Sequence, residues 1–270
     1  MSKPLMFVVV FGLLLCAGII IGHFIADNTR VVKVVPDLTV ADNFPTAKPQ
    51  GLENRIFKPS NALKLFSIGL RADDALSNPT SVKPDKFGNV YIFDWGDLSL
   101  LKFSQEGRFI QKFGKGRGQG PGEFQNPTDF TVAMNGDVWI GDPSTGIITI
   151  FNLDGSVKQT IRPKSLPHRI VCLNTGDFIL MSTATTNHLF EKYNAAGKFQ
   201  SSFGLLLRDQ NKYPILTDGW VVIGEDNALY YTLLRAGLLA SFSPHGDLRF
   251  FMETIDRIPL PKIEVFTIRE

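Results

Sequence analysis

"FGKGRGQGPGEFQNP", residues 113–127, separates two segments of the chain that repeat one another. Three groups of residues recur 48 positions further on: Asn78-Pro79-Thr80-Ser81 as Asn126-Pro127-Thr128-Asp129, Gly88-Asn89-Val90-Tyr91-Ile92 as Gly136-Asp137-Val138-Trp139-Ile140, and the pair Phe103 and Gly107 as Phe151 and Gly155. A repeat of about 40–50 residues with short strands and tight turns is typical of a β-propeller blade.

The turn glycine continues beyond these two units, at Gly197 and Gly246. An aromatic residue precedes each turn glycine by four positions: Phe103, Phe151, Tyr193 and Phe242. In the second unit the pattern predicts four strands, at 130–133, 138–140, 147–151 and 157–161. Asn-Gly and Asp-Gly pairs separate them and favour hairpins, because these residues tolerate positive φ. Helical periodicity is absent from this region.

The predicted fold is therefore all-β: a β-propeller of four-stranded antiparallel blades, with units at 79–113, 127–162, 167–203 and 215–252. Residues 57–69 resemble the last two strands of a further blade, with Leu63-Lys64-Leu65-Phe66 as its outer strand, and 261–268 resemble a first strand. The two could combine in one composite blade, which would avoid an open sheet edge. Whether the ring has five or six blades, and whether it closes, stays open.

The glycine-rich stretch also resembles the connector of NHL repeats, "F-G-x-x-G-x-G-P-G-E-F-x-x-P". The segment after it, with Val138-Trp139-Ile140-Gly141-Asp142, is similar as well. The resemblance covers about residues 57–268 and is sharp over 79–162. It implies a bacterial 6-bladed β-propeller protein of the TolB-like superfamily. Most such proteins resemble binding modules, and some relatives are lyases or lactonases.

The N-terminus predicts one transmembrane helix at residues 5–26, preceded by a short cytoplasmic tail at 1–4. About 20 apolar residues span the hydrocarbon core. A linker at 27–56, with a strand expected at 31–35, then leads to the propeller at 57–270. The expected location is a bacterial cell membrane, single-pass, with the propeller on the periplasmic or extracellular side. A cleaved signal peptide, or a lipoprotein using Cys16, are the alternatives.

Net charge, cysteine content and the absence of enzyme motifs argue against several classes of function. The net charge is +2 and the basic residues are scattered, so no nucleic-acid partner is expected. Cys16 and Cys172 lie in segments that do not suggest a disulfide. No serine-hydrolase elbow, phosphate loop or kinase motif occurs. We expect no cofactor; calcium and zinc stay open as alternatives, although neither has a recognisable ligand motif.

The candidate binding residues lie in predicted loops on one face of the ring. Asp94 and Asp142 end the second strands of successive units, where they either form a carboxylate pair near the channel or cap turns. Trp95 and Arg117 are preferred, because exposed Trp and Arg are enriched at binding hot spots, although Trp95 could equally pack between blades. The full set is Asp94, Trp95, Asp97, Arg117, Gln119, Asp142, His188 and Arg235.

Three functions follow as hypotheses. The first is a membrane-anchored scaffold that binds a protein or a small molecule on the propeller face. The second, from the resemblance, is a metal-dependent lyase or lactonase of the propeller type. The third is a truncated propeller without a specific function.

Overall fold

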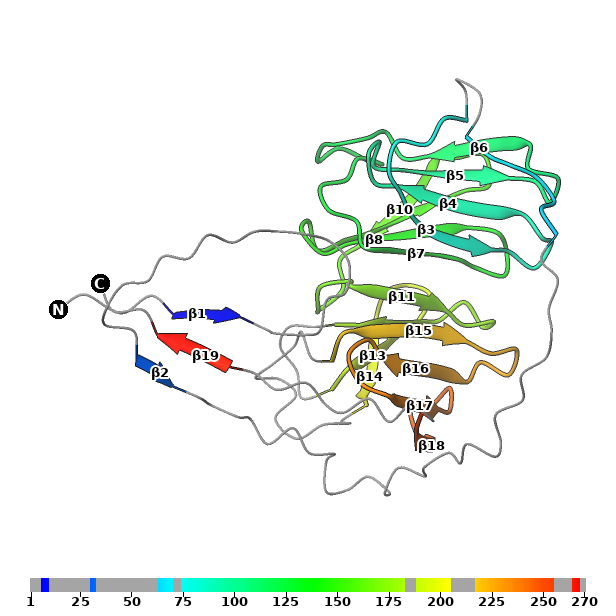
Figure 1. The fold of residues 1–270 in the computed structure, drawn as a ribbon. Coiled ribbons are helices and arrows are strands. Elements are labelled where there is room, and N and C mark those ends of the chain that lie inside the picture. The colour runs from blue at the N-terminus through cyan, green and yellow to red at the C-terminus, as the bar shows by residue number, and fades with distance from the viewer. Residues whose placement is uncertain are drawn as a thin grey trace.

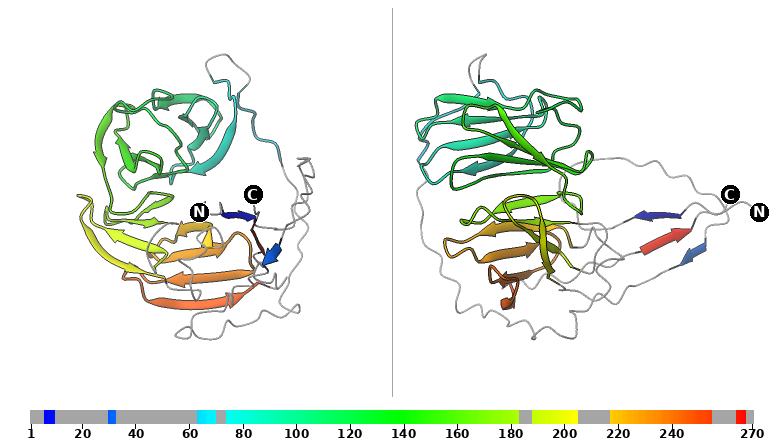
Figure 2. Two further views of the ribbon diagram at one scale, coloured as in Figure 1. Left: turned by 90° about the vertical axis from the view of Figure 1, so that its left-hand side faces the viewer. Right: turned by 180° about the vertical axis from the view of Figure 1, so that it is seen from behind.

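Sixteen short strands of the chain form four separate sheets in the computed structural model, and each sheet is an antiparallel meander of four consecutive strands. The structure describes residues 6–9, 30–32, 63–69, 74–182, 188–204, 217–254 and 264–267. The four sheets follow one another around an arc, as Figure 2 shows. They match the four units of the sequence, so the predicted propeller of four-stranded blades is confirmed.

The strands of the four blades are labelled in Figure 1. Their bounds are β3 (Pro79–Pro84), β4 (Val90–Asp94), β5 (Ser99–Phe103) and β6 (Phe109–Phe113) in the first blade, β7 (Asp129–Val132), β8 (Val138–Asp142), β9 (Ile147–Phe151) and β10 (Val157–Ile161) in the second, β11 (Arg169–Cys172), β12 (Phe178–Met181), β13 (Phe190–Tyr193) and β14 (Phe199–Phe203) in the third, and β15 (Gly219–Ile223), β16 (Leu229–Leu233), β17 (Leu238–Phe242) and β18 (Leu248–Glu253) in the fourth.

The predicted turn glycines occupy the same bend in every blade, between the third and fourth strands. Each has a positive φ: 78° at Gly107, 81° at Gly155, 80° at Gly197 and 97° at Gly246. Each glycine N–H donates to the carbonyl three residues earlier. Glycine adopts this left-handed conformation without the steric cost that a Cβ atom brings. The periodicity of these glycines therefore reflects a repeated hairpin.

The apolar cores lie between neighbouring blades. One joins the first and second blades, where Phe113 and Phe151 meet edge to face with ring centroids 6.0 Å apart. Another joins the second and third through Trp139 and Phe178, at 5.2 Å. The aromatic residues that precede the turn glycines are all at most 1% exposed. Stacking of sheets on alternating apolar side chains therefore holds the blades together.

The first strand of each blade is its inner strand. β11 contacts both β7 and β15. The ammonium of Lys83 on β3 lies 2.6 Å from Asp129 on β7, so β3 and β7 also meet. The fourth strands are outermost and present mixed, largely exposed faces.

Residues 63–66 were expected to form an outer strand, and this prediction is wrong: no strand forms there, and Leu63 and Leu65 are 83% and 82% exposed. A strand needs a partner for its backbone groups, and the described residues offer none at this place. Phe66 nevertheless lies on the hairpin of the first blade, since a Cβ atom on Gly107 would come within 2.6 Å of its ring. In the other three blades, the turn glycine is covered by the outer strand of the preceding blade. The covering residues are Gln111 at Gly155, Ile161 at Gly197 and Phe203 at Gly246. Phe66 therefore packs on the first blade's hairpin where, in the other blades, a residue of the preceding blade's outer strand packs.

The two ends of the chain meet in a fifth, three-stranded sheet. β19 (Glu264–Thr267) pairs antiparallel with β1 (Met6–Val9) on one side and with β2 (Arg30–Val32) on the other. The expected strands at 261–268 and 31–35 are present in part, but β19 pairs with β1 and β2 and not with the described residues 63–69. This sheet lies apart from the four blades (Figure 1).

The predicted membrane helix at 5–26 overlaps this sheet. Met6–Val9 is a strand, contrary to the helix expected there, because a four-residue apolar run fits either structure and its pairing decides between them. The rest of 5–26, and the linker at 27–56 apart from β2, lie outside the described residues. Among the residues described, no helix has the length and apolar character to cross a membrane. The anchor therefore stays a prediction.

Candidate functional site

The predicted site residues belong to one face of the propeller, which we call the connector face. It comprises the turns between second and third strands, such as 94–98 and 142–146, and the connectors that lead into the first strands, such as 114–128. These elements lie at the same end because consecutive strands are antiparallel. Two parts of this face bring predicted residues together: a Trp–Arg pair and a cavity.

Asp94 and Asp142 hold this face in shape. Asp94 is fully buried and accepts the N–H groups of Ser77, Asn78 and Gly96, at 2.6, 2.7 and 3.0 Å. Asp142 is 2% exposed and accepts four N–H groups in the same manner, from Gln125, Asn126, Ser144 and Thr145. Each carboxylate thus fastens the incoming connector to the turn. Turn capping describes both residues, and an open carboxylate pair does not.

Trp95 and Arg117 form the Trp–Arg pair. The indole is 38% exposed, and the guanidinium carbon of Arg117 lies 6.0 Å from its ring centroid. Arg117 Nη1 also donates to the carbonyl of Gln125, at 3.2 Å, and the backbone N–H of Trp95 donates to the carbonyl of Asn78. Asp97, two residues after Trp95, lies 3.6 Å from the ammonium of Lys112, with both side chains about half-exposed. The indole is therefore partly exposed and oriented by the connector, not enclosed between blades.

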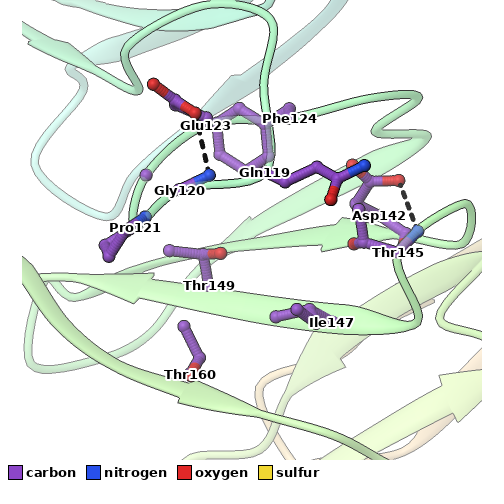
Figure 3. A pocket seen from close by; sticks show the side chains of 11 residues that line it. Gln119, Gly120, Pro121, Glu123, Phe124, Asp142, Thr145, Ile147, Thr149 and Thr160 are labelled. Carbon is purple, nitrogen blue, oxygen red and sulfur yellow. Dashed lines mark hydrogen bonds between the residues drawn. The ribbon is translucent and has the colours of Figure 1, made fainter.

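Gln119 and Asp142 line one cavity of about 180 Å³, shown in Figure 3. The connector residues 119–124 form one wall, and β9 and β10 form the other with Thr149 and Thr160. Glu123 lies in the connector wall and accepts the N–H of Gly120 at 2.8 Å. This cavity brings the predicted residues Gln119 and Asp142 together.

His188 and Arg235 belong to the other half of the arc. His188 precedes β13 in the third blade, with its Nδ1 atom 3.4 Å from Ser202 Oγ. Arg235 is half-buried in the turn between β16 and β17. The predicted set is thus divided, with six residues on the first two blades and two on the last two.

A second Trp–Arg pair was missed by sequence reasoning. The guanidinium carbon of Arg169 lies 4.6 Å from the ring centroid of Trp220, which is 49% exposed. Arg169 also donates to the carbonyls of Thr128 and Gly219, at 3.2 and 3.3 Å, and so links β7, β11 and β15. The sequence places Arg169 and Trp220 near the starts of successive units. This spacing indicates a contact only once the inner strands β11 and β15 are known to be adjacent.

Asp218 completes this group. Its Oδ1 atom lies 3.2 Å from His168 Nε2 and 3.6 Å from Arg169 Nη2. Burial raises the pKa of Asp218, but the hydrogen bond with His168 and the charge of Arg169 lower it by more, so the pKa lies below its usual value. The carboxylate is therefore held ionised between two basic side chains.

Metal and thiol chemistry have little support among these residues. The part of the chain that the structure describes contains no group of three or more His, Cys, Asp or Glu side chains arranged to hold a metal ion. Burial raises the pKa of the Cys172 thiol, which keeps it protonated and unreactive.

The fold and this face define the class of protein: a β-propeller whose first-strand connectors lie on one face. The family model for the 6-bladed beta-propeller matches residues 71–218, which is more than half of the chain. The chain belongs to this 6-bladed beta-propeller family. The match does not test the narrower NHL assignment, which remains an interpretation of the connector sequence. No curated protein matches the chain.

Several solved structures are similar to parts of this chain. A streptogramin B lyase is 16% identical, with a TM-score of 0.48, over 65% of this chain and 54% of its own. A virginiamycin B lyase from Staphylococcus aureus, determined with quinupristin, is 12% identical, with a TM-score of 0.49, over 73% of this chain and 84% of its own. A protein of unknown function from Bacteroides caccae is 13% identical, with a TM-score of 0.45, over 71% and 72%. The chain thus spans about half the length of the first of these lyases.

Proposed function

We propose that this protein is a binding propeller, anchored in the membrane by residues 5–26, whose Trp95–Arg117 pair contacts an acidic partner outside the cytoplasm. The observation that carries the proposal is the partly exposed indole of Trp95 beside the guanidinium of Arg117. Both residues are enriched at energetic hot spots, because they bury a large area and also make directional polar contacts. They stand on a sheet scaffold that needs little ordering when a partner binds.

Charge around the pair favours an acidic partner. Lys112, Lys115 and Arg117 are exposed within six residues of one another, and the carboxylates of Asp97 and Glu123 offset two of these three charges. The surface therefore carries a net positive charge next to an aromatic ring. A carboxylate can pair with the guanidinium while an apolar group packs on the indole. Such complementarity contributes specificity and association rate more than affinity.

The test uses the full chain in detergent and two labelled peptides of equal length, polyglutamate and a glycine–serine peptide, with fluorescence anisotropy as the measurement. We expect polyglutamate to bind, less tightly at high salt, and the glycine–serine peptide to bind weakly. Trp95→Ala and Arg117→Gln should each weaken binding by about tenfold, a loss typical of one interface anchor. Arg249→Gln is the matched control, because Arg249 is an exposed arginine of the fourth blade paired with Asp226.

Two outcomes would overturn the proposal. One is equal binding of both peptides, or binding that neither substitution changes. The other is metal-dependent turnover of a simple lactone by the full chain, which would place the protein among the lyases and lactonases instead.

A further inference from the structure

The cavity beside Gln119 receives a hydroxyl that no described protein group pairs. Thr149 of β9 is 5% exposed and lines the cavity, and no described residue makes a hydrogen bond with its hydroxyl. Figure 3 shows Thr149 and Thr160 on the sheet side of the cavity, facing the connector residues. A hydroxyl that opens into a cavity and lacks a protein partner is free to bond to water or to a ligand.

The equivalent position in the third blade is filled by the chain itself. Thr149 and Glu191 both lie six residues before the hairpin glycine. Glu191 is 1% exposed and accepts hydrogen bonds from Ser165 Oγ of the connector, at 2.8 Å, and from the hydroxyl of Tyr193. The connector and the strand thus close this space with a complete polar network.

The first and fourth blades close the same position with apolar side chains. Leu101 and Ala240 stand there, at 4% and 0% exposed. Among the four blades that the structure describes, only the second therefore presents an unpaired hydroxyl to a cavity at this position. In the second blade, the glycine-rich connector residues 119–124 form the wall opposite this position.

The cavity wall has a distinct chemistry. Thr149, Thr160 and the side-chain amide of Gln119 are neutral groups that both donate and accept hydrogen bonds. Two carboxylates, those of Glu123 and Asp142, also line the cavity, and no lysine or arginine does. An anion would be repelled by these carboxylates. A cation would gain little from these carboxylates, because the oxygens of Asp142 already accept backbone N–H groups and Glu123 accepts the N–H of Gly120.

We propose that this cavity binds a primary carboxamide, either the side chain of an asparagine or glutamine in a partner polypeptide or a free small amide. A carboxamide offers one acceptor and two donors without a charge, which matches the hydroxyls and the amide of the wall. A volume of about 180 Å³ exceeds the roughly 30 Å³ of one water several-fold, so there is room for such a group. The proposal deepens the binding function proposed above and rests on it for the connector face, but it uses different residues.

Three probes of similar size test the chemistry on the full chain in detergent: propionamide, propionate and propylammonium. Binding is followed by the NMR shifts of the backbone amides of 119–124 and of β9. We expect propionamide to bind with a millimolar dissociation constant and to shift these signals, and the two ions to bind more weakly. Equal or tighter binding of either ion, or no shift with propionamide, would overturn the proposal.

Thr149→Val removes the hydroxyl at nearly constant volume and should weaken propionamide binding by about fivefold, the effect of one hydrogen bond. Thr149→Ser keeps the hydroxyl and should retain binding even if the loss of the methyl group lowers stability. Thr131→Val on β7 is the matched control, because Thr131 does not line the cavity. Unchanged binding in Thr149→Val would contradict the assignment.

Two further experiments distinguish a polypeptide ligand from a free amide, and the carboxamide site from the acidic-partner site. A neutral Ser-Gln-Ser peptide that binds more tightly than propionamide would identify a polypeptide partner, and equal or weaker binding of the peptide would identify a free amide. Trp95→Ala should leave propionamide binding unchanged while it weakens polyglutamate binding. Failure of the carboxamide site is thereby distinguishable from failure of the acidic-partner site.

Discussion

The ammonium of Lys83 lies 2.6 Å from Oδ1 of Asp129, and this pair joins the inner strands of the first two blades. Lys83 Nζ also donates to the carbonyl of Phe130, at 2.5 Å, and lies 5.0 Å from the centroid of its ring. The second oxygen of Asp129 accepts the N–H of Ile170 in the third blade. One carboxylate, with a side chain 5% exposed, therefore connects three successive blades.

Lys83→Met should lower the free energy of unfolding by about 2 kcal/mol, because it leaves a buried carboxylate without its cation. Chemical denaturation of the full chain in detergent measures this. Arg249→Gln breaks an exposed pair with Asp226 and should change stability by less than about 1 kcal/mol. Equal effects of the two substitutions would mean that Lys83 contributes no more than a surface ion pair.

Gly155→Ala should also destabilise the protein, by about 2 kcal/mol. At φ 81° a Cβ atom is strained, and it would clash with the side chain of Gln111 and lie 3.0 Å from the carbonyl oxygen of Lys112. Gly176→Ala is a control for φ alone, since its φ is 88° and its Cβ would meet only Ala195, at 3.7 Å. We expect a larger loss at Gly155 in thermal denaturation. A larger loss at Gly176 would refute the proposed packing of the first blade's outer strand on this hairpin.

Asp218 should make stability depend on acid pH. Its pKa is lower in the folded protein than its usual value, so the unfolded chain binds the proton more readily. The stabilisation is therefore complete above the unfolded pKa of about 3.9 and is lost as pH falls through the folded value. Asp218→Asn should lower stability near pH 7 by about 1 kcal/mol and should flatten this part of the profile. Denaturation midpoints of both proteins across acid pH give the comparison, and parallel profiles would exclude this role.

Residues 5–26 should hold the chain in the membrane of a bacterial host. We expect the full chain to stay in the membrane fraction after alkaline carbonate washing, because about 20 apolar residues span the bilayer. Protease added to intact spheroplasts should digest the propeller. A variant lacking residues 5–26 should fail to associate with the membrane. A mature protein whose N-terminus begins after this segment would instead indicate a cleaved signal peptide.

The amino-acid sequence by itself determined the blades. One bend in each unit requires a positive φ, which favours glycine, and the aromatic residue four positions earlier packs between the blades. Both residue types therefore recur periodically in the sequence. Local features of this kind are encoded within a few residues of one another. Turn capping by Asp94 and Asp142 is also a local feature, and the sequence predicted it as one of two interpretations, the other being a carboxylate pair near the channel.

Only the tertiary structure decided which residues meet. Thr149 faces a cavity while Glu191, at the same position of the next blade, is satisfied by Ser165, and Arg169 stacks on Trp220 from a neighbouring blade. Residues 63–66 have strand-like alternation and yet form no strand, because pairing depends on a partner that alternation does not specify. Contacts between blades depend on how whole sheets pack around the axis. A repeat pattern in the sequence predicts the sheets but does not predict which side chains meet between them.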